Sequence, residues 1–179
     1  MRVIAGRAKG HKLLLKDSLA VRPTSDKVKG AVFNMLAPFI PGCSFLDLFA
    51  GSGAMGIEAW SRGAARVVFV EKDRRVYAQL RANLERVGFL QAECLQADYQ
   101  AALHRLQGES FAVIFIDPPY LAGYYQPALD LIEKLQLLTQ GGWLCLEHPR
   151  SWQLPDNHHF VTHQHKYYGD TAITILRRQ

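Results

Sequence analysis

The sequence lacks the features that direct a chain into a membrane or an oxidising compartment. No apolar run reaches the ~18 residues that span a bilayer, and the opening stretch MRVIAGRAKG has no apolar signal-peptide core. The three cysteines, Cys43, Cys94 and Cys145, form no C-x-x-C pair, so neither a disulfide framework nor a thiolate zinc site is indicated. We therefore expect a cytoplasmic protein with reduced thiols.

Basic charge is concentrated at the N-terminus. Residues 1–30 hold eight Lys and Arg side chains against two Asp, although the net charge of the whole 179-residue chain is only +5. A basic segment on a nearly neutral body is typical of an arm that binds a polyanion, but a solvated charged end has the same composition. Charge alone leaves both interpretations open.

Strand-like and helix-like segments alternate from residue 44 onward, after a small hairpin expected at 2–5 and 12–15 and a helix that begins near Thr24 or Ser25. The expected strands are 44–49, 66–71, 92–97, 111–116, 141–148, 158–169 and 171–178. The expected helices between them are 52–63, 74–86, 99–106 and 127–138. This pattern predicts an α/β fold with a mostly parallel sheet, helices on both faces and a hairpin at Gly169-Asp170.

A glycine-rich turn follows the first expected core strand. Gly51, Gly53 and Gly56 form G-x-G-x-x-G in a strand–turn–helix setting, which lets a backbone approach a ligand. Glu71 ends the next strand, where a carboxylate can accept hydrogen bonds from a ribose diol. The same motif is found in NAD sites, but Asp47 would repel a pyrophosphate. It suits a ligand with an ammonium and a sulfonium group, which describes S-adenosylmethionine; otherwise Asp47 orders the loop.

A rigid polar corner, Asp117-Pro118-Pro119-Tyr120, ends the strand AVIFI at the carboxyl edge of the expected sheet, where ligands of open α/β sheets bind. The prolines fix two backbone angles. The Asp117 carboxylate and the Pro118 carbonyl can then accept both N–H groups of an exocyclic amine on a base. Tyr120 offers a flat face for a base removed from its stack.

With these residues in view, the chain resembles the class I S-adenosylmethionine-dependent methyltransferases, and more closely the bacterial 16S rRNA (guanine-N2)-methyltransferase family called RsmD. The stretches RVIAGRAKGHKL, RPTSDKVKGAVFNML, DLFAGSGAMGIEAWSRGA, VEKD, FIDPPY and KYYGDTAI are similar to that family's signatures, in its order. The resemblance implies a Rossmann-like, seven-stranded sheet with a reversed last strand. It also implies a basic RNA-binding extension, 1–41, on a catalytic core, 42–179.

The resemblance further implies roles for individual residues. The cofactor would be held by Asp47, Ala50, Gly51, Gly53, Glu71, Lys72 and Asp98, with Glu71 on the ribose and Asp98 on the adenine. The target guanine would be held by Asp117, Pro118 and Tyr120. From the basic charge and from a helix N-terminus that can hold an anion, we expect RNA to be bound by Arg2, Arg7, Lys9, Lys12, Arg22 and Thr24. The partner would be 16S rRNA, within the small subunit or its assembly intermediate, and the protein a monomer. No metal is expected.

Three further points stay open. Adenine-N6 methylation of DNA uses the same corner, and a non-catalytic RNA-binding assembly protein could keep the fold; the basic N-terminus favours RNA, and Asp117 favours catalysis. Tyr124 and Tyr125 could close over the substrate or pack in the core. The late histidines are His158, His159, His163 and His165, and the last three would share one strand face, yet no cysteine or carboxylate cluster completes a metal site.

Overall fold

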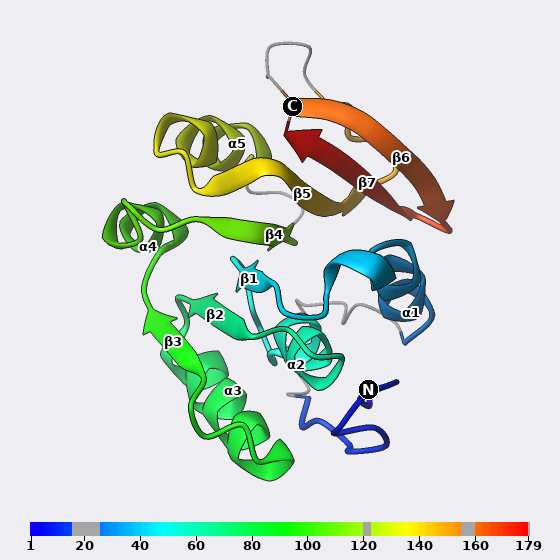
Figure 1. Cartoon of the computed structure of the whole chain (residues 1–179), viewed down its shortest axis with the longest axis vertical. Helices are drawn as coiled ribbons and strands as arrows, with labels where there is room; N and C mark the ends of the chain where they lie inside the picture. The colour runs from blue at the N-terminus through cyan, green and yellow to red at the C-terminus, as the bar shows by residue number, and fades with distance from the viewer. Residues whose placement is uncertain (16–25, 120–122, 155–159, 179) are drawn as a thin grey trace.

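The structure, a computed structural model, describes residues 1–15, 26–119, 123–154 and 160–178 (Figure 1). The helices are α1 (Asp26–Met35), α2 (Ala54–Ser61), α3 (Arg74–Val87), α4 (Tyr99–Arg105), α5 (Tyr125–Lys134) and a short 3-10 helix, η1 (Ala37–Phe39). The strands are β1 (Ser44–Asp47), β2 (Arg66–Glu71), β3 (Glu93–Gln96), β4 (Phe111–Ile116), β5 (Leu138–Pro149), β6 (Phe160–Tyr168) and β7 (Thr171–Arg178). The predicted alternation of strand and helix is confirmed.

All of these strands join one seven-stranded sheet in the order β3-β2-β1-β4-β5-β7-β6. The strands from β3 to β5 pair in parallel, whereas β7 runs antiparallel to both of its neighbours, β5 and β6. A tight turn at Gly169, whose φ is +65°, connects β6 to β7, and only an antiparallel pair can be joined so closely. The predicted hairpin and reversed last strand are confirmed.

Helices cover both faces of the sheet. One apolar core lies under α1, α2, α3 and the N-terminal segment (residues 1–15), and the other lies under α4 and α5 (Figure 1). Strand β1 sits between the two cores: Phe45 belongs to the first and Leu46 to the second, and both are at most 1% exposed. Burial on both faces explains why the central strands read as continuous apolar runs.

Both predicted ends of α5 and the predicted start of β5 were wrong. Helix α5 begins at Tyr125, because proline is tolerated in the first turn, so Pro127 does not mark its start. It ends at Lys134, since Gln136 takes a positive φ of 54° and the chain then enters β5 at Leu138. The expected N-terminal hairpin is reduced to a single antiparallel bridge between Arg2 and Lys12.

The three cysteines are free, and Cys43 and Cys145 are buried in the core. In the residues that the structure describes, no helix is both long and apolar enough to cross a membrane.

Candidate active site

The glycine loop connects β1 to α2 at the carboxyl edge of the sheet. Gly51 and Gly53 have φ angles of +53° and +82°, which disfavour any side chain. A Cβ on Gly53 would lie 2.4 Å from Leu80 Cδ1, so packing against α3 also requires glycine there. A Cβ on Gly51 would meet no atom within 4 Å. The Gly51 backbone is therefore open to approach by a ligand.

The Asp47 carboxylate lies beneath this loop and is 1% exposed. Its Oδ2 accepts a hydrogen bond from the Gly56 amide at 2.9 Å, which ties the end of β1 to the first turn of α2. Burial raises the pKa of Asp47 to about 7, the Gly56 bond opposes that rise, and Glu71 adds to it. The structure thus shows the loop-ordering role that the sequence left open; a contact with the cofactor stays a prediction.

Glu71, at the end of β2, holds the other side of the loop. Its Oε2 accepts from the Gly51 amide at 3.0 Å, and its Oε1 accepts from the Asp73 amide at 2.8 Å. Burial raises the pKa of this carboxyl above its ordinary value, while the two backbone bonds lower it. Because a carboxylate offers about four acceptor positions, these two bonds leave capacity for ribose hydroxyls.

Asp98 follows β3 and caps α4, with Oδ1 accepting from the Gln100 amide at 3.0 Å. Its Oδ2 lies 3.3 Å from Nζ of the exposed Lys72, so the two residues predicted to bind cofactor form an ion pair. The carboxyl ends of β1, β2 and β3 thus bring Asp47, Glu71 and Asp98 to one edge of the sheet.

The Asp117 corner lies beside the glycine loop. Asp47 pairs with Phe115 in the β1–β4 register, and the Leu48 amide donates to the Phe115 carbonyl at 3.1 Å. Asp117 and Pro118 follow immediately, at the carboxyl edge, with Asp117 partly exposed and Pro118 buried. Tyr120 falls outside the described residues.

A second carboxylate at this edge was not predicted. Ile116 pairs with Leu146, and Asp117 and Glu147 are the next residues after this pair along the two chains. Glu147 is 4% exposed, and both carboxylates help to raise the pKa of the buried Cys145 thiol, after burial itself. The sequence analysis missed Glu147 because it lies at the end of an apolar run that was interpreted only as a buried strand.

The two tyrosines after the corner take packing positions. Tyr125 is 2% exposed, and its hydroxyl donates to the Glu147 carbonyl at 3.0 Å. Tyr124 packs with Phe49 and Tyr99, with ring centroids 6.1 and 5.3 Å away. Of the two roles left open by the sequence, the structure supports packing for both.

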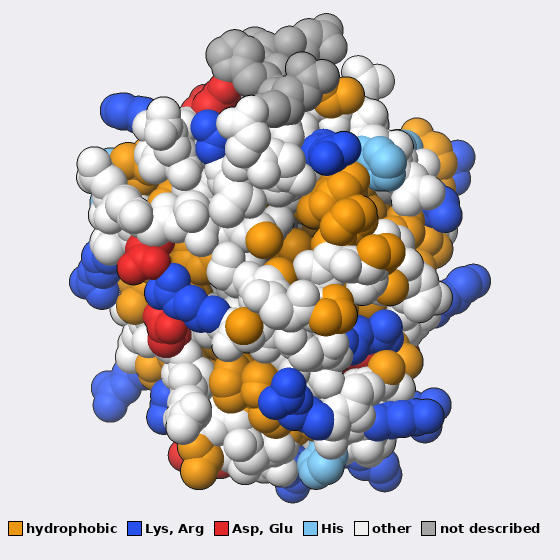
Figure 2. Space-filling view, in the orientation of Figure 1, with side chains coloured by type: hydrophobic (Ala, Val, Ile, Leu, Met, Phe, Trp, Pro, Cys, Tyr) orange, Lys and Arg blue, Asp and Glu red, His pale blue; other side chains and the backbone are white. Residues whose placement is uncertain are grey.

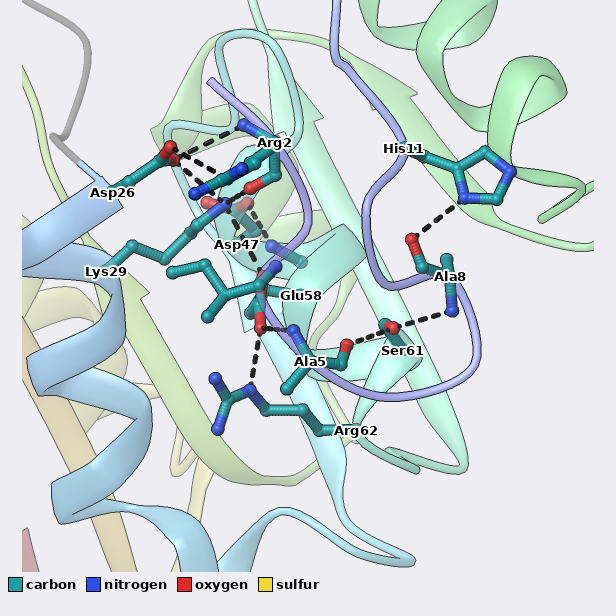
Figure 3. Close-up of polar contacts among 12 residues, drawn as sticks. Arg2, Ala5, Ala8, His11, Asp26, Lys29, Asp47, Glu58, Ser61 and Arg62 are labelled. Atoms are coloured by element: carbon teal, nitrogen blue, oxygen red, sulfur yellow. Dashed lines mark hydrogen bonds and ion pairs between the residues drawn. The ribbon is translucent and has the colours of Figure 1, made fainter.

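The N-terminal segment is anchored to α2 by Glu58, which the sequence analysis missed (Figure 3). The fully buried Glu58 carboxylate accepts from the amides of Ile4 and Ala5 at 2.8 and 3.0 Å and from Arg62 Nε at 2.7 Å. Lys29 Nζ, also 0% exposed, lies 3.4 Å away and donates to the Arg2 carbonyl at 2.6 Å. Burial lowers the pKa of Lys29, and Glu58 opposes that shift.

Ser61 makes a second anchor at the far end of α2. Its Oγ accepts from the Ala8 amide at 2.9 Å and donates to the Ala5 carbonyl at 2.5 Å, as Figure 3 shows. Gly6 passes so close that a Cβ there would lie 1.8 Å from the Ser61 carbonyl oxygen. The N-terminal segment is thus packed as part of the fold.

The predicted RNA-binding residues lie in different surroundings. Arg2, Lys9 and Lys12 are exposed, and the lower right of Figure 2 shows Lys and Arg side chains gathered over the N-terminal segment. The Arg7 guanidinium lies over the Trp60 ring at 5.1 Å. Lys29 is one of the eight basic side chains in residues 1–30, but it is buried and therefore cannot contribute its charge to an RNA-binding surface. Arg22 and Thr24 lie outside the described residues.

His163 and His165 do not share one strand face as predicted, and His158 and His159 lie outside the described residues. A register shift between Thr162 and Gln164 in β6 places His163 at a bulge, beside Trp143. His165 bonds Thr174 Oγ1, which also bonds the buried His148. Among the residues described, no group of three potential metal ligands comes together.

The sequence matches a family model described as Conserved hypothetical protein 95 over residues 1–177. The chain belongs to this family. The match includes the N-terminal segment and β7 as well as the glycine loop, so it covers every part of the candidate site.

Named relatives agree with this assignment. The Putative rRNA methyltransferase YlbH of Bacillus subtilis is 37% identical over 183 residues, covering 100% of both chains. Ribosomal RNA small subunit methyltransferase D of Escherichia coli is 33% identical over 188 residues, covering 100% of this chain and 90% of the relative. A solved structure, the putative methyltransferase yhhF from Escherichia coli, aligns with a TM-score of 0.90 at 33% identity, covering 100% of this chain and 98% of the other. The resemblance to the RsmD family and the class I methyltransferase fold are both confirmed.

Proposed function

We propose that this protein methylates the exocyclic N2 amine of a guanine in 16S rRNA, with S-adenosylmethionine as the cofactor. The observation that carries the proposal is the register that brings the Asp117–Pro118 corner beside the glycine loop. Family membership and the relatives named for rRNA methylation support the substrate class.

The residues at the glycine loop fit this cofactor. S-adenosylmethionine supplies a methyl group attached to a positively charged sulfur, and it also carries an ammonium group. The buried Asp47 carboxylate is complementary to that positive charge, and the open backbone at Gly51 leaves room for the methionine part. Ala50 and Gly53 shape the same turn through the 2.7 Å bond from the Gly53 amide to the Ala50 carbonyl.

The adenosine part would lie along the ends of β2 and β3. Glu71 has acceptor capacity for the ribose hydroxyls beyond its two backbone bonds. Asp98, held by α4 and by Lys72, would accept from the adenine amine. These assignments follow the family's pattern.

The target amine would be held by two acceptors. One of its N–H groups would donate to the Asp117 carboxylate and the other to the Pro118 carbonyl. As the nitrogen lone pair forms the new N–C bond, the C–S electron pair stays on sulfur and the amine becomes positive. Asp117 stabilises that charge and takes the leaving proton. Positioning supplies much of the remaining rate enhancement, because the amine is a weak nucleophile, and Tyr120 would stack on the base.

The N-terminal segment would bind the RNA backbone. Its exposed basic side chains, Arg2, Lys9 and Lys12, together with Arg7, offer charge to phosphates. We also propose Arg22 and Thr24, which lie outside the described residues, as RNA contacts. We further propose that residues 1–41 form the RNA-binding extension of a core at 42–179, in a monomer that acts in the cytoplasm on 16S rRNA of the small subunit or its assembly intermediate.

The test offers methyl-labelled S-adenosylmethionine with unmodified small subunits, free 16S rRNA and duplex DNA, followed by nucleoside analysis. We expect N2-methylguanine in rRNA. Asp117→Ala should abolish transfer with little change in cofactor affinity, and Asp130→Ala, an exposed carboxylate on α5, is the matched control. Activity that survives Asp117→Ala would contradict the amine clamp.

Two other products would identify the rival functions. Recovery of the label as N6-methyladenine would show that the base held at the Asp117–Pro118 corner is adenine. No label in any substrate, together with tight rRNA binding, would indicate a non-catalytic assembly protein.

A further inference from the structure

Asn83, on α3, touches both the N-terminal segment and the glycine loop. Its Oδ1 accepts from the Leu14 amide at 2.7 Å, and its Nδ2 donates to the Leu14 carbonyl at 3.0 Å and to the Ser52 carbonyl at 2.9 Å. The Leu14 amide can only donate, so it fixes the orientation of the Asn83 side chain. The Asn83 side chain is itself fully buried, and all three bonds are at least partly buried.

Other residues of α3 bind the N-terminal segment without reaching the loop in the bonds the structure shows. Gln79 Nε2 donates to the Leu14 carbonyl, and Arg86 Nη1 donates to the Lys12 carbonyl at 3.4 Å. Asn83 differs because one of its two donors is directed to Ser52, between Gly51 and Gly53. The side chain therefore ties Leu14 to the loop assigned to the cofactor.

We propose that Asn83 is a positioning residue that couples the N-terminal segment to cofactor binding. The inference rests on the proposed function, since it takes the ligand of the glycine loop to be S-adenosylmethionine. Two states are involved: residues 12–14 docked on α3, with the Ser52 carbonyl held, and the same segment undocked, with Ser52 released. A cofactor that binds better to the held loop shifts this equilibrium toward the docked state.

The coupling works in both directions. If the cofactor binds the docked state more tightly by some factor, anything that favours docking tightens cofactor binding by up to the same factor. RNA bound across the basic side chains near Lys12 would therefore strengthen cofactor binding, and cofactor would strengthen RNA binding. Couplings of this kind are typically about 5-fold to 150-fold.

The first test uses hydrogen exchange on the unmodified protein, with S-adenosylhomocysteine as a probe that cannot transfer a methyl group. Saturating probe should slow exchange of the Leu14 amide by about fivefold or more. The Ala8 amide is the internal control, because it bonds Ser61 at the other anchor and should be unaffected.

The second test compares two substitutions on the same helix. Asn83→Ala should weaken probe binding by about fivefold or more, raise KM for S-adenosylmethionine more than it lowers kcat, and remove the protection of the Leu14 amide. Gln79→Ala loses a bond to the same Leu14 carbonyl but none to Ser52, so its Kd for the probe should stay within about twofold of the parent. A purely structural role for Asn83 would lower Tm but leave the Kd for the probe unchanged.

The outcomes separate the two proposals. Probe binding with no change in Leu14 exchange overturns the coupling and leaves the proposed function standing. Equal weakening by Asn83→Ala and Gln79→Ala overturns the specific role of Asn83. If the parent protein does not bind the probe, the cofactor assignment fails and this inference fails with it. The exchange experiment needs no variant, so it decides the question even if Asn83→Ala does not fold.

Discussion

Replacing Lys29 with methionine should destabilise the protein strongly, although the new side chain keeps much of the original volume. The ammonium group is 0% exposed, lies 3.4 Å from Glu58 and donates to the Arg2 carbonyl at 2.6 Å. Its removal leaves the Glu58 carboxylate buried without this cation. Breaking a buried pair in this way typically costs about 3–5 kcal/mol.

The structure places the expected loss at the lower end of that range. Glu58 keeps the hydrogen bonds from Ile4, Ala5 and Arg62, which still stabilise its charge. We therefore expect a loss of about 3 kcal/mol in the free energy of unfolding, which for a chain of this size lowers Tm by roughly 6–12 °C. Adding Glu58→Gln should cost less than the two single losses combined, because the residues share one network.

Guanidinium unfolding followed by circular dichroism measures the loss, and Lys27→Met is the matched control. Lys27 lies on the same helix but is exposed, so its replacement should change stability by less than about 0.5 kcal/mol. A loss below about 1 kcal/mol for Lys29→Met would refute the reasoning, since it would mean that the buried pair contributes no more than an exposed one.

Three other measurements test the site. Burial raises the pKa of Asp47 to about 7, and a cationic ligand favours the charged carboxylate. Calorimetry should therefore show cofactor affinity rising about fivefold between pH 6 and pH 7, and Asp47→Asn should remove that rise. Gly56→Ala would put a Cβ 2.2 Å from the Phe69 ring, so chemical denaturation should show a loss of about 1–3 kcal/mol. Neutralising Lys9 and Lys12 should lower the salt slope of RNA binding by about two, and an unchanged slope would contradict the RNA-binding arm.

The order of strands and helices could be predicted because it depends on local patterns. The apolar strands, the glycines at the first turn and the carboxylates at the strand ends are all visible in short stretches of sequence. Once a parallel sheet is inferred, the strand ends must meet at one edge, so Asp47, Glu71 and Asp117 follow. The predicted start of α5 was wrong because a proline can stand at the first residue of a helix or later in its first turn. Pro127 alone therefore does not show where α5 begins.

The anchors of the N-terminal segment could not be predicted, because their partners are distant in the chain. Glu58 bonds residues 53 and 54 positions away, and Asn83 bonds Leu14 at a separation of 69. In sequence, a Glu or Asn within a helix is typical of a solvated face. A sequence signal did exist for one anchor: the positive-φ Gly6 lies where close packing against Ser61 excludes any side chain.

The buried pair changes how the basic N-terminus should be interpreted. Composition suggested that its charge serves RNA binding, yet Lys29 serves folding, and Arg7 lies over Trp60, which itself stacks on Phe89 at 4.5 Å. Deleting the segment would therefore remove core residues such as Val3 and the partners of Glu58 together with the proposed phosphate contacts. Loss of RNA binding in such a deletion would not separate folding from recognition. Substitution of single exposed lysines does separate them, because it leaves the buried anchors in place.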